Sequence, residues 1–252
     1  MAEVSLIPCR TDNYAYLIAS KSERTAIVVD PGEARSVKQT LAEQQLQLTH
    51  ILVTHHHSDH IAGIAELTQS YNCAVIGLAA DSARIPEITR GISQDETFTI
   101  ENIQFNTIFT PGHTRSHVSY YAPQLKALFC GDTLFSLGCG RLFEGSAEQM
   151  LQSLKTLSSL PEETLIYCGH EYTASNLRFA LSVDPDNQAL IARGKEIAAL
   201  RDKGHPTIPS SLATEKATNP FLRAHISTIQ QRLNSTSELE TFRILRELKD
   251  NF

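Results

Sequence analysis

The sequence His50-Ile51-Leu52-Val53-Thr54-His55-His56-His57-Ser58-Asp59-His60 joins an apolar, β-prone run to four histidines and one aspartate within positions 55–60. Side chains two positions apart on an extended backbone project to the same side, so His55 and His57 are expected to face a common point. Asp59 and His60 follow where the chain should turn into a helix, and they approach from another direction. A solvated, histidine-rich turn is the alternative, but a metal site explains the crowding of imidazoles better.

Three later segments repeat this arrangement, with a polar residue close behind an apolar run. Residues 108–114, 127–133 and 165–171 supply His113, Asp132 and His170. In each segment a glycine precedes the polar residue and lets the backbone turn sharply. Because loops at strand ends often build sites, we expect these side chains to join the histidine cluster. Imidazole and carboxylate ligands without thiolate suit zinc, iron or manganese.

The composition is that of an ordinary globular protein of 252 residues, with a net charge of -6. Nucleic-acid binding needs a basic face, which this balance disfavours. No apolar run approaches the roughly 18 residues of a membrane helix, and the first residues do not resemble a signal peptide. The five cysteines form no C-x-x-C pair. A cytoplasmic protein without nucleic-acid or membrane partners is expected.

Short apolar runs between turn residues predict strands, and apolar residues at helical spacing predict helices between them. The expected strands are 4–7, 14–18, 25–29, 50–54, 74–78, 97–100, 103–109, 117–121, 126–130 and 164–168. The expected helices are 35–46, 61–70, 147–158, 173–182, 187–202, 226–233 and 237–249. This order favours two sheets with helices outside them. Because no convincing strand follows His170, we expect one domain at 1–170 and an all-helical one at 171–252.

The ordered motifs T-H-x-H-x-D-H, P-G-H-T, G-D-T and G-H resemble those of the metallo-β-lactamase superfamily. Within it, Gly138-Cys139-Gly140-Arg141-Leu142-Phe143-Glu144-Gly145 and Cys168-Gly169-His170-Glu171-Tyr172-Thr173 are similar to glyoxalase II, the hydroxyacylglutathione hydrolases. The likeness extends from Asp12-Asn13-Tyr14 to Lys249-Asp250-Asn251-Phe252. It implies an α+β fold: an αββα sandwich followed by a small, all-helical C-terminal domain that covers the substrate.

The resemblance also implies a dinuclear metal centre. By position, one metal would be held by His55, His57 and His113, the other by Asp59, His60 and His170, with Asp132 bridging both. Asp59 would also orient a hydroxide shared by the two metals. Zinc is the first expectation, with iron and manganese as alternatives. Asp30, which ends its own strand, is expected to orient His60 or another ligand, because ligating imidazoles usually have an acceptor behind them.

The reaction implied by the resemblance is hydrolysis of S-D-lactoylglutathione to D-lactate and glutathione, the second step of methylglyoxal detoxification. The shared hydroxide would attack the thioester carbonyl while one metal polarises it. The glutathione carboxylates require a cationic clamp, and Arg246 and Lys249 on the terminal helix match the basic pair of the family. Tyr172 matches the tyrosine after the last histidine. Arg141 and Phe143 stand where many relatives have lysine and tyrosine.

Two other functions stay open at this point. A mononuclear-iron persulfide dioxygenase acting on glutathione persulfide needs only two histidines and one carboxylate, and it leaves His170 and the basic terminal helix unexplained. A metal-loaded glutathione-binding protein without turnover would bind glutathione and leave its thioesters intact. Lactonase or ribonuclease activity is disfavoured further, since the chain is acidic and has no inserted nucleic-acid domain. A hydrolase that acts as a monomer on a small-molecule thioester is the favoured interpretation.

Overall fold

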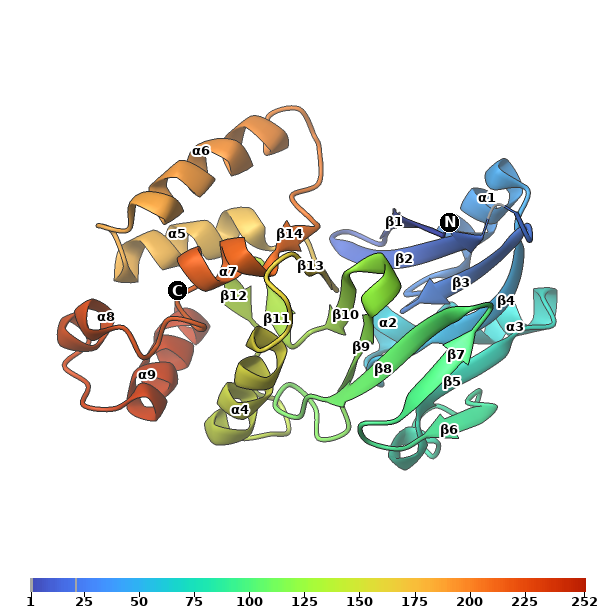
Figure 1. Ribbon diagram of the computed structural model, residues 1–252, viewed down its shortest axis with the longest axis horizontal. Coiled ribbons are helices and arrows are strands. Elements are labelled where there is room, and N and C mark those ends of the chain that lie inside the picture. The colour runs from blue at the N-terminus through green and yellow to red at the C-terminus, as the bar shows by residue number, and fades with distance from the viewer. Residues whose placement is uncertain (1, 21) are drawn as a thin grey trace. The chain divides into compact units, whose positions relative to one another are not determined.

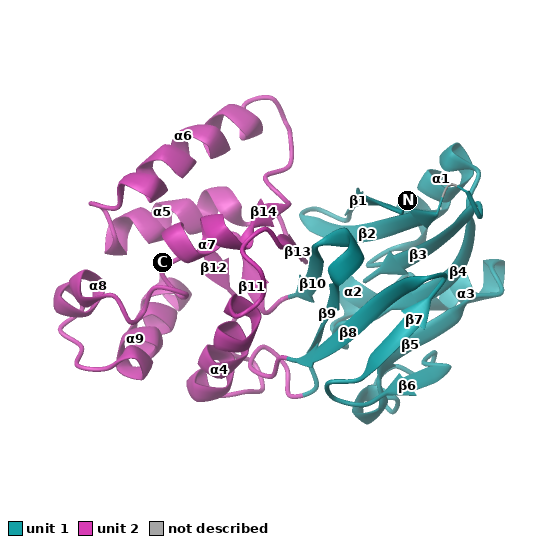
Figure 2. Cartoon of the chain, viewed as in Figure 1, with its two compact units in different colours: residues 1–109, 116–131 teal, residues 110–115, 132–252 magenta. Residues whose placement is uncertain are grey.

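The computed structural model describes residues 2–20 and 22–252, and Figure 1 shows their helices and strands. The chain forms two compact units, coloured separately in Figure 2: residues 1–109 with 116–131, and residues 110–115 with 132–252. The first unit contains most of the strands and the second most of the helices. None of the helices in the described part of the chain combines the length and the apolar character of a membrane span.

The first sheet lies in the first unit and has the strand order β1-β2-β3-β4-β5-β6. These strands are Glu3–Cys9, Asn13–Ser20, Thr25–Val29, Gln47–Leu52, Ala74–Leu78 and Arg90–Ile92. β1 to β3 pair antiparallel, and β3 to β6 pair parallel. Parallel neighbours need crossover connections. The helical elements between them are α1 (Ala34–Gln44), α2 (Ser58–Ile61), α3 (Ile64–Ser70) and the 3-10 helix η1 (Ala79–Asp81).

Helices α1 and α3 contribute to a common core with this sheet. Val37 and Leu41 of α1 are four residues apart and therefore lie on one face of the helix. They are buried in the same apolar cluster as Leu67 of α3 and as Val28 and Ile51 of the sheet. Burial of each such side chain contributes roughly 1.5–3 kcal/mol. This cluster fixes the strand ends from which the candidate ligands continue.

The second sheet of this unit contains the antiparallel strands β7 (Thr97–Ile100), β8 (Ile103–Phe109), β9 (Val118–Ala122) and β10 (Ala127–Gly131). The 3-10 helix η2 (Pro123–Leu125) connects the last two. Tyr16 of β2 packs on Phe129 of β10 with ring centroids 5.8 Å apart. The hydroxyl of Tyr120 donates to the Val53 carbonyl at 2.8 Å. The expectation of two sheets with helices outside them is thus confirmed in this unit.

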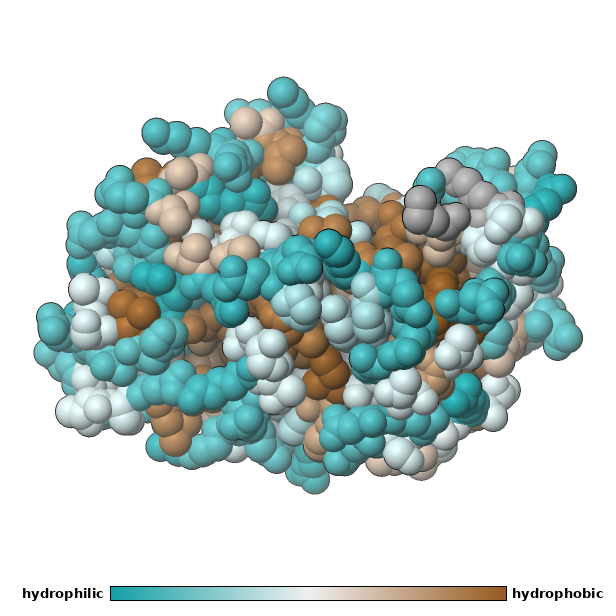
Figure 3. Space-filling view, in the orientation of Figure 1, coloured by the Kyte–Doolittle hydropathy of each residue, from teal (hydrophilic) through white to brown (hydrophobic). Residues whose placement is uncertain are grey.

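The second unit is built from short strands and six helices among its described residues. The strands are β11 (Leu134–Phe135), β12 (Gly138–Cys139), β13 (Leu165–Cys168) and β14 (Ser210–Ser211). The helices are α4 (Ala147–Ser158), α5 (Thr173–Val183), α6 (Gln188–Arg201), α7 (Leu212–Thr218), α8 (Ser227–Arg232) and α9 (Glu238–Asp250). Its core includes Phe221, whose ring contacts those of Phe179 and Phe242 at centroid distances of 6.0 and 5.7 Å. On the face shown in Figure 3, hydrophilic residues cover most of these helices.

Local signals explain where several of these helices begin. Ser146 and Gln149 form a reciprocal capping box at the start of α4. The Asn187 side chain accepts from two backbone N–H groups at the start of α6, and the Ser237 hydroxyl accepts from the Glu240 N–H at the start of α9. Helix α7 and strand β14 were not expected from the sequence. The strand has only two residues, too few to show alternation, and the helix makes only about two turns.

Candidate metal centre and substrate pocket

The first group of predicted ligands follows β4 in the first unit, where the chain passes through the histidines into α2. The ring centroid of His55 lies 4.8 Å from that of His57 and 4.2 Å from that of His60. Asp59 stands beside them, with Oδ2 3.6 Å from His60 Nε2. The four side chains predicted from this stretch are therefore close neighbours.

A buried carboxylate fixes the orientation of His60. Asp30 is 4% exposed, and its Oδ2 lies 3.1 Å from His60 Nδ1. Thr54 holds this carboxylate in turn: its backbone N–H donates to Oδ1 at 2.8 Å and its hydroxyl donates to Oδ2 at 2.6 Å. A carboxylate at this position favours the tautomer with the proton on Nδ1, which leaves the lone pair of Nε2 available to a metal. The expectation that Asp30 orients His60 is confirmed.

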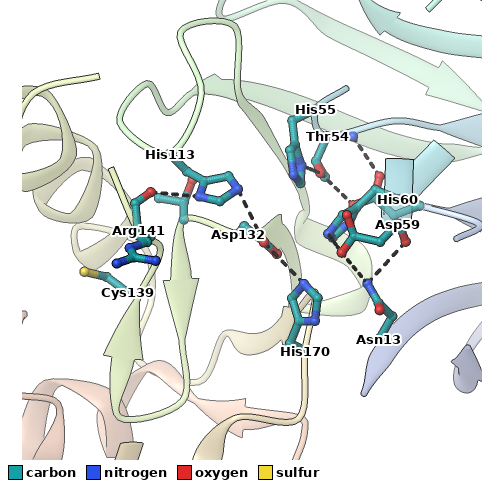
Figure 4. Close-up of polar contacts among 12 residues, drawn as sticks. Asn13, Thr54, His55, Asp59, His60, His113, Asp132, Cys139, Arg141 and His170 are labelled. Carbon is teal, nitrogen blue, oxygen red and sulfur yellow. Dashed lines mark hydrogen bonds and ion pairs between the residues drawn. The ribbon is translucent and has the colours of Figure 1, made fainter. Parts of the chain in front are cut away.

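Asn13 supports Asp59 and was missed as a functional residue. Its side-chain amide donates to Asp59 Oδ2 at 2.9 Å and to the Asp59 carbonyl at 3.2 Å, as Figure 4 shows. Asn13 is 7% exposed and begins β2. The two bonds fix both the side chain and the backbone of the aspartate. In the sequence, Asn13 stands out only through the Asp12-Asn13-Tyr14 run and its family likeness.

We expect Asn13→Ala to lower metal affinity by about 10–100-fold, the usual effect of removing a group that supports a ligand. Asp59 would lose its donor and sample other rotamers, and the fold would be retained. Equilibrium titration of metal-free protein with zinc, read by a chromophoric chelator, measures the change. Asn106→Ala, which removes an amide from strand β8, serves as the control. Equal zinc affinity in Asn13→Ala and wild type would contradict a supporting role for Asn13.

The second group of predicted ligands lies in the second unit. Asp132 Oδ2 is 3.4 Å from His113 Nε2 and 3.3 Å from His170 Nε2, and both rings point toward this carboxylate in Figure 4. All three side chains are buried. His113 Nδ1 lies 2.8 Å from the carbonyl oxygen of Arg141, an acceptor that favours the proton on Nδ1. The three residues form a compact set of nitrogen and oxygen donors.

Two of these ligands follow glycines whose backbone conformation and surroundings exclude a larger residue. Gly131 has φ of 44°, and a Cβ there would lie 2.3 Å from Thr54 Oγ1. Gly112 has φ of 150°, and a Cβ there would lie 2.8 Å from the Cβ of Met150. The sharp turns ahead of Asp132 and His113 therefore depend on glycine.

Both groups have donor chemistry that suits divalent metals. In the first unit, Asp59 Oδ2 lies 3.6 Å from His60 Nε2, and the His55 ring lies beside those of His57 and His60. In the second unit, one carboxylate oxygen of Asp132 lies near two imidazole nitrogens. Buried imidazoles and carboxylates without thiolate fit zinc, iron or manganese. Each unit therefore carries residues that can coordinate a divalent metal.

A pocket of about 310 Å³ lies entirely within the second unit. Its lining includes four of the five predicted substrate-binding residues: Arg141, Tyr172, Arg246 and Lys249. The fifth, Phe143, is not part of this lining; it is 60% exposed, and its ring centroid lies 5.3 Å from that of His113. Helices α5 and α9 and the segment after β12 thus bring together residues that are far apart in sequence.

The two basic residues of α9 have different environments. Arg246 is 7% exposed; its Nη1 donates to the Cys139 carbonyl at 2.9 Å, and its guanidinium lies 5.2 Å from the Phe221 ring. Lys249 is half-buried, with Nζ 5.6 Å from the Phe179 ring. Burial, and then the neighbouring charge of Arg246, lower the pKa of Lys249 from its usual value. Arg246 is therefore a fixed cation and Lys249 a more accessible one.

Two other side chains connect the pocket with its surroundings. The Tyr172 ring stacks on that of His170, with centroids 4.6 Å apart and planes 5° apart. The pocket therefore adjoins a predicted metal ligand of the same unit. Burial raises the pKa of the Cys139 thiol to about 11, so this thiol is protonated at neutral pH and is a poor nucleophile.

A buried polar network holds the β11–β12 hairpin, which contributes Phe135 and Cys139 to the pocket. Glu215 of α7 is completely buried and accepts from the Ser136 hydroxyl at 2.9 Å and the Leu137 N–H at 2.8 Å. The Asn219 amide donates to the carbonyls of Phe135 at 3.0 Å and Gly138 at 2.9 Å. Sequence reasoning missed this network because its partners are about 80 positions apart.

Two family descriptions match consecutive parts of the chain. Residues 10–170 match the Metallo-beta-lactamase superfamily, and residues 171–252 match Hydroxyacylglutathione hydrolase C-terminus. The hydroxyacylglutathione hydrolase of Bartonella tribocorum is 47% identical over 97% of this chain and 97% of its own length. That of a Synechococcus strain is 47% identical over 98% of each chain.

A solved structure adds evidence on the fold. The B3 metallo-β-lactamase BLEG-1 gives a TM-score of 0.67 at 24% sequence identity, covering 87% of this chain and 99% of that one. This likeness agrees with the helix and sheet layers of the first unit, and the predicted fold class is confirmed. The two family matches cover nearly the whole chain, and the two relatives are 47% identical to it over nearly its full length. The chain therefore belongs to the hydroxyacylglutathione hydrolase family of the metallo-β-lactamase superfamily.

Proposed function

We propose that the protein hydrolyses the thioester of S-D-lactoylglutathione to D-lactate and glutathione, the second step of methylglyoxal detoxification. The pocket of the second unit carries the proposal, because it joins three cations to Tyr172, which stacks on His170. Guanidinium and ammonium groups suit the two carboxylates of a glutathione moiety. The names of relatives at 47% identity support the same substrate.

The seven candidate ligands would hold two divalent metals, with zinc the first candidate and iron or manganese the next. We assign His55, His57 and His113 to one metal, Asp59, His60 and His170 to the other, and Asp132 to both. When bound, two such metals supply a hydroxide at neutral pH and polarise a carbonyl oxygen. The buried nitrogen and oxygen donors of each unit support this assignment.

The chain's own residues would orient the reactants. Asp59, held by Asn13, accepts a hydrogen bond from the attacking oxygen and aims its lone pair at the thioester carbon. Asp30 keeps His60 in the tautomer that a metal requires. The leaving group is a thiolate, which departs without a strong general acid, and no residue is assigned that role. The pocket cations hold the glutathione part of the substrate while the bond breaks.

Residues 1–170 would carry out catalysis and residues 171–252 would mainly bind the substrate, in line with the extents of the two family matches. Arg141 of the first part also lines the pocket, so both parts contribute to binding. The protein would act as a monomer in the cytoplasm, a reducing compartment that suits its five free cysteines. Its net charge of -6 disfavours a nucleic-acid partner.

Loss of the thioester absorbance of S-D-lactoylglutathione, followed with purified, metal-loaded protein, tests the proposal. We expect rapid hydrolysis and release of one free thiol per thioester, detected with a thiol reagent. Binding of glutathione without hydrolysis would instead identify a metal-loaded binding protein. Oxygen consumption on glutathione persulfide, with one iron per chain, would identify a dioxygenase. Either result would overturn the proposed hydrolase.

A further inference from the structure

The substrate pocket contains a carboxylate of the protein itself. Oδ1 of Asp250, the last residue of α9, lies 3.3 Å from Arg141 Nε and 3.0 Å from Arg246 Nη2. One oxygen therefore contacts two of the three cations that line the pocket. A glutathione carboxylate would seek the same guanidinium groups. Asp250 thus occupies the place that such a carboxylate would take in the pocket.

The helix itself gains little from this carboxylate, because its i,i+4 ion pair with Arg246 is worth only about 0.2–0.5 kcal/mol. Asp250 is in the last turn of α9, where the helix dipole favours positive and disfavours negative charge. Arg246 does not depend on Asp250 for its position, because it also contacts the Cys139 carbonyl and the Phe221 ring. Arg141 has a side chain that is 57% exposed and can turn from Asp250 toward a ligand. An exchange of partners therefore requires little rearrangement of the protein.

We infer that Asp250 is a built-in competitor for the carboxylates of the glutathione moiety. It pairs with the guanidinium groups of Arg141 and Arg246 and so lowers the affinity of the pocket for glutathione after hydrolysis. The three cations and the one carboxylate of the pocket lining carry a summed charge of +2, which rises to +3 when the carboxylate is removed. The role is one of specificity and product release, not of bond breaking. It rests on the proposed function, since it takes glutathione to be the group that competes.

Calorimetric titration of the metal-loaded protein with glutathione tests the inference. Asp250→Asn keeps the size of the side chain and removes its charge, and we expect it to bind glutathione about tenfold more tightly, with a steeper salt dependence. The matched control is Glu247→Gln, an equal charge change at an exposed position of the same helix that does not line the pocket. This control is expected to stay within about twofold of wild type.

The possible outcomes separate the competitor role from the proposed function. If wild type hydrolyses the thioester and Asp250→Asn binds glutathione no more tightly, Asp250 is not a competitor. Weaker binding by a folded Asp250→Asn variant would assign it the opposite role, holding the arginines in place for the ligand. Equal tightening in both variants would reduce the effect to overall charge and overturn the inference. Wild type that neither hydrolyses the thioester nor binds glutathione would overturn the proposed function as well.

Discussion

Asp132→Ala is expected to lower the rate of thioester hydrolysis by well over 100-fold while the protein remains folded. Loss of a group that only supports a ligand costs about 10–100-fold in metal affinity or activity, and a direct ligand should cost more. Asp132 is the one carboxylate that contacts both His113 and His170 among the described residues of the second unit. Its loss would leave their ring nitrogens without the anion that balances a bound cation.

Metal content and activity should be measured on the same samples of this variant. We expect fewer bound metals per chain than in wild type, and a circular dichroism spectrum that does not change. Asp186→Ala is a suitable control, because it removes a carboxylate that is 90% exposed and lies outside the candidate site. A full metal complement together with near-normal hydrolysis in Asp132→Ala would contradict the ligand role of Asp132.

Glu215→Leu is expected to lower the free energy of unfolding by about 3 kcal/mol or more, since each buried donor left unpaired costs about 1–3 kcal/mol. The Ser136 hydroxyl and the Leu137 N–H would lose this acceptor. The Asn219 amide would keep the two backbone carbonyls that it also contacts. Burial raises the pKa of Glu215, and the donors around it oppose this shift by favouring the carboxylate. The hydrogen-bond donors therefore stabilise the charged form of Glu215, which its apolar surroundings disfavour.

Urea unfolding and substrate kinetics together distinguish a local from a general effect of this change. At roughly 2–4 °C per kcal/mol for a chain of this size, a loss of about 3 kcal/mol lowers Tm by about 6–12 °C. Because the β11–β12 hairpin lines the pocket, KM should rise more than kcat falls. The control is Glu162→Gln, which removes an exposed ion pair with Lys216, a neighbour of Glu215 on α7. It should change the free energy of unfolding by at most about 1 kcal/mol. Unchanged stability in Glu215→Leu would show that the network is dispensable.

The candidate ligands could be identified from the sequence because each carries a local signal. His55, His57 and their neighbours follow one apolar strand, and His113, Asp132 and His170 each follow a glycine at the end of another. The same alternation of strands and helices predicted two sheets with helices outside them. Resemblance to a family then divided the ligands between two metals. Local pattern and resemblance together were sufficient to name the candidate site.

The residues that support the site gave no such signal. Asn13 meets Asp59 across 46 positions, and Glu215 meets Leu137 across 78. Such pairs are formed by the folded chain, and the supporting partner, Asn13 or Glu215, lies in no local pattern that indicates its role. In the sequence, Asp250 belongs only to the run of family likeness at the end of the chain, because its effect depends on the two arginines that it contacts. Sequence patterns reveal clusters of metal-binding side chains more readily than single polar residues whose partners are distant in the sequence.

Titration of metal-free protein with zinc, with hydrolysis of S-D-lactoylglutathione measured at each step, tests the central claim most directly. The chelated protein is expected to be folded and inactive. Hydrolysis should rise with added zinc and reach its maximum at about two metals per chain, as a dinuclear centre requires. Full activity at one metal per chain, or no hydrolysis with two metals bound, would contradict the dinuclear thioester hydrolase proposed here.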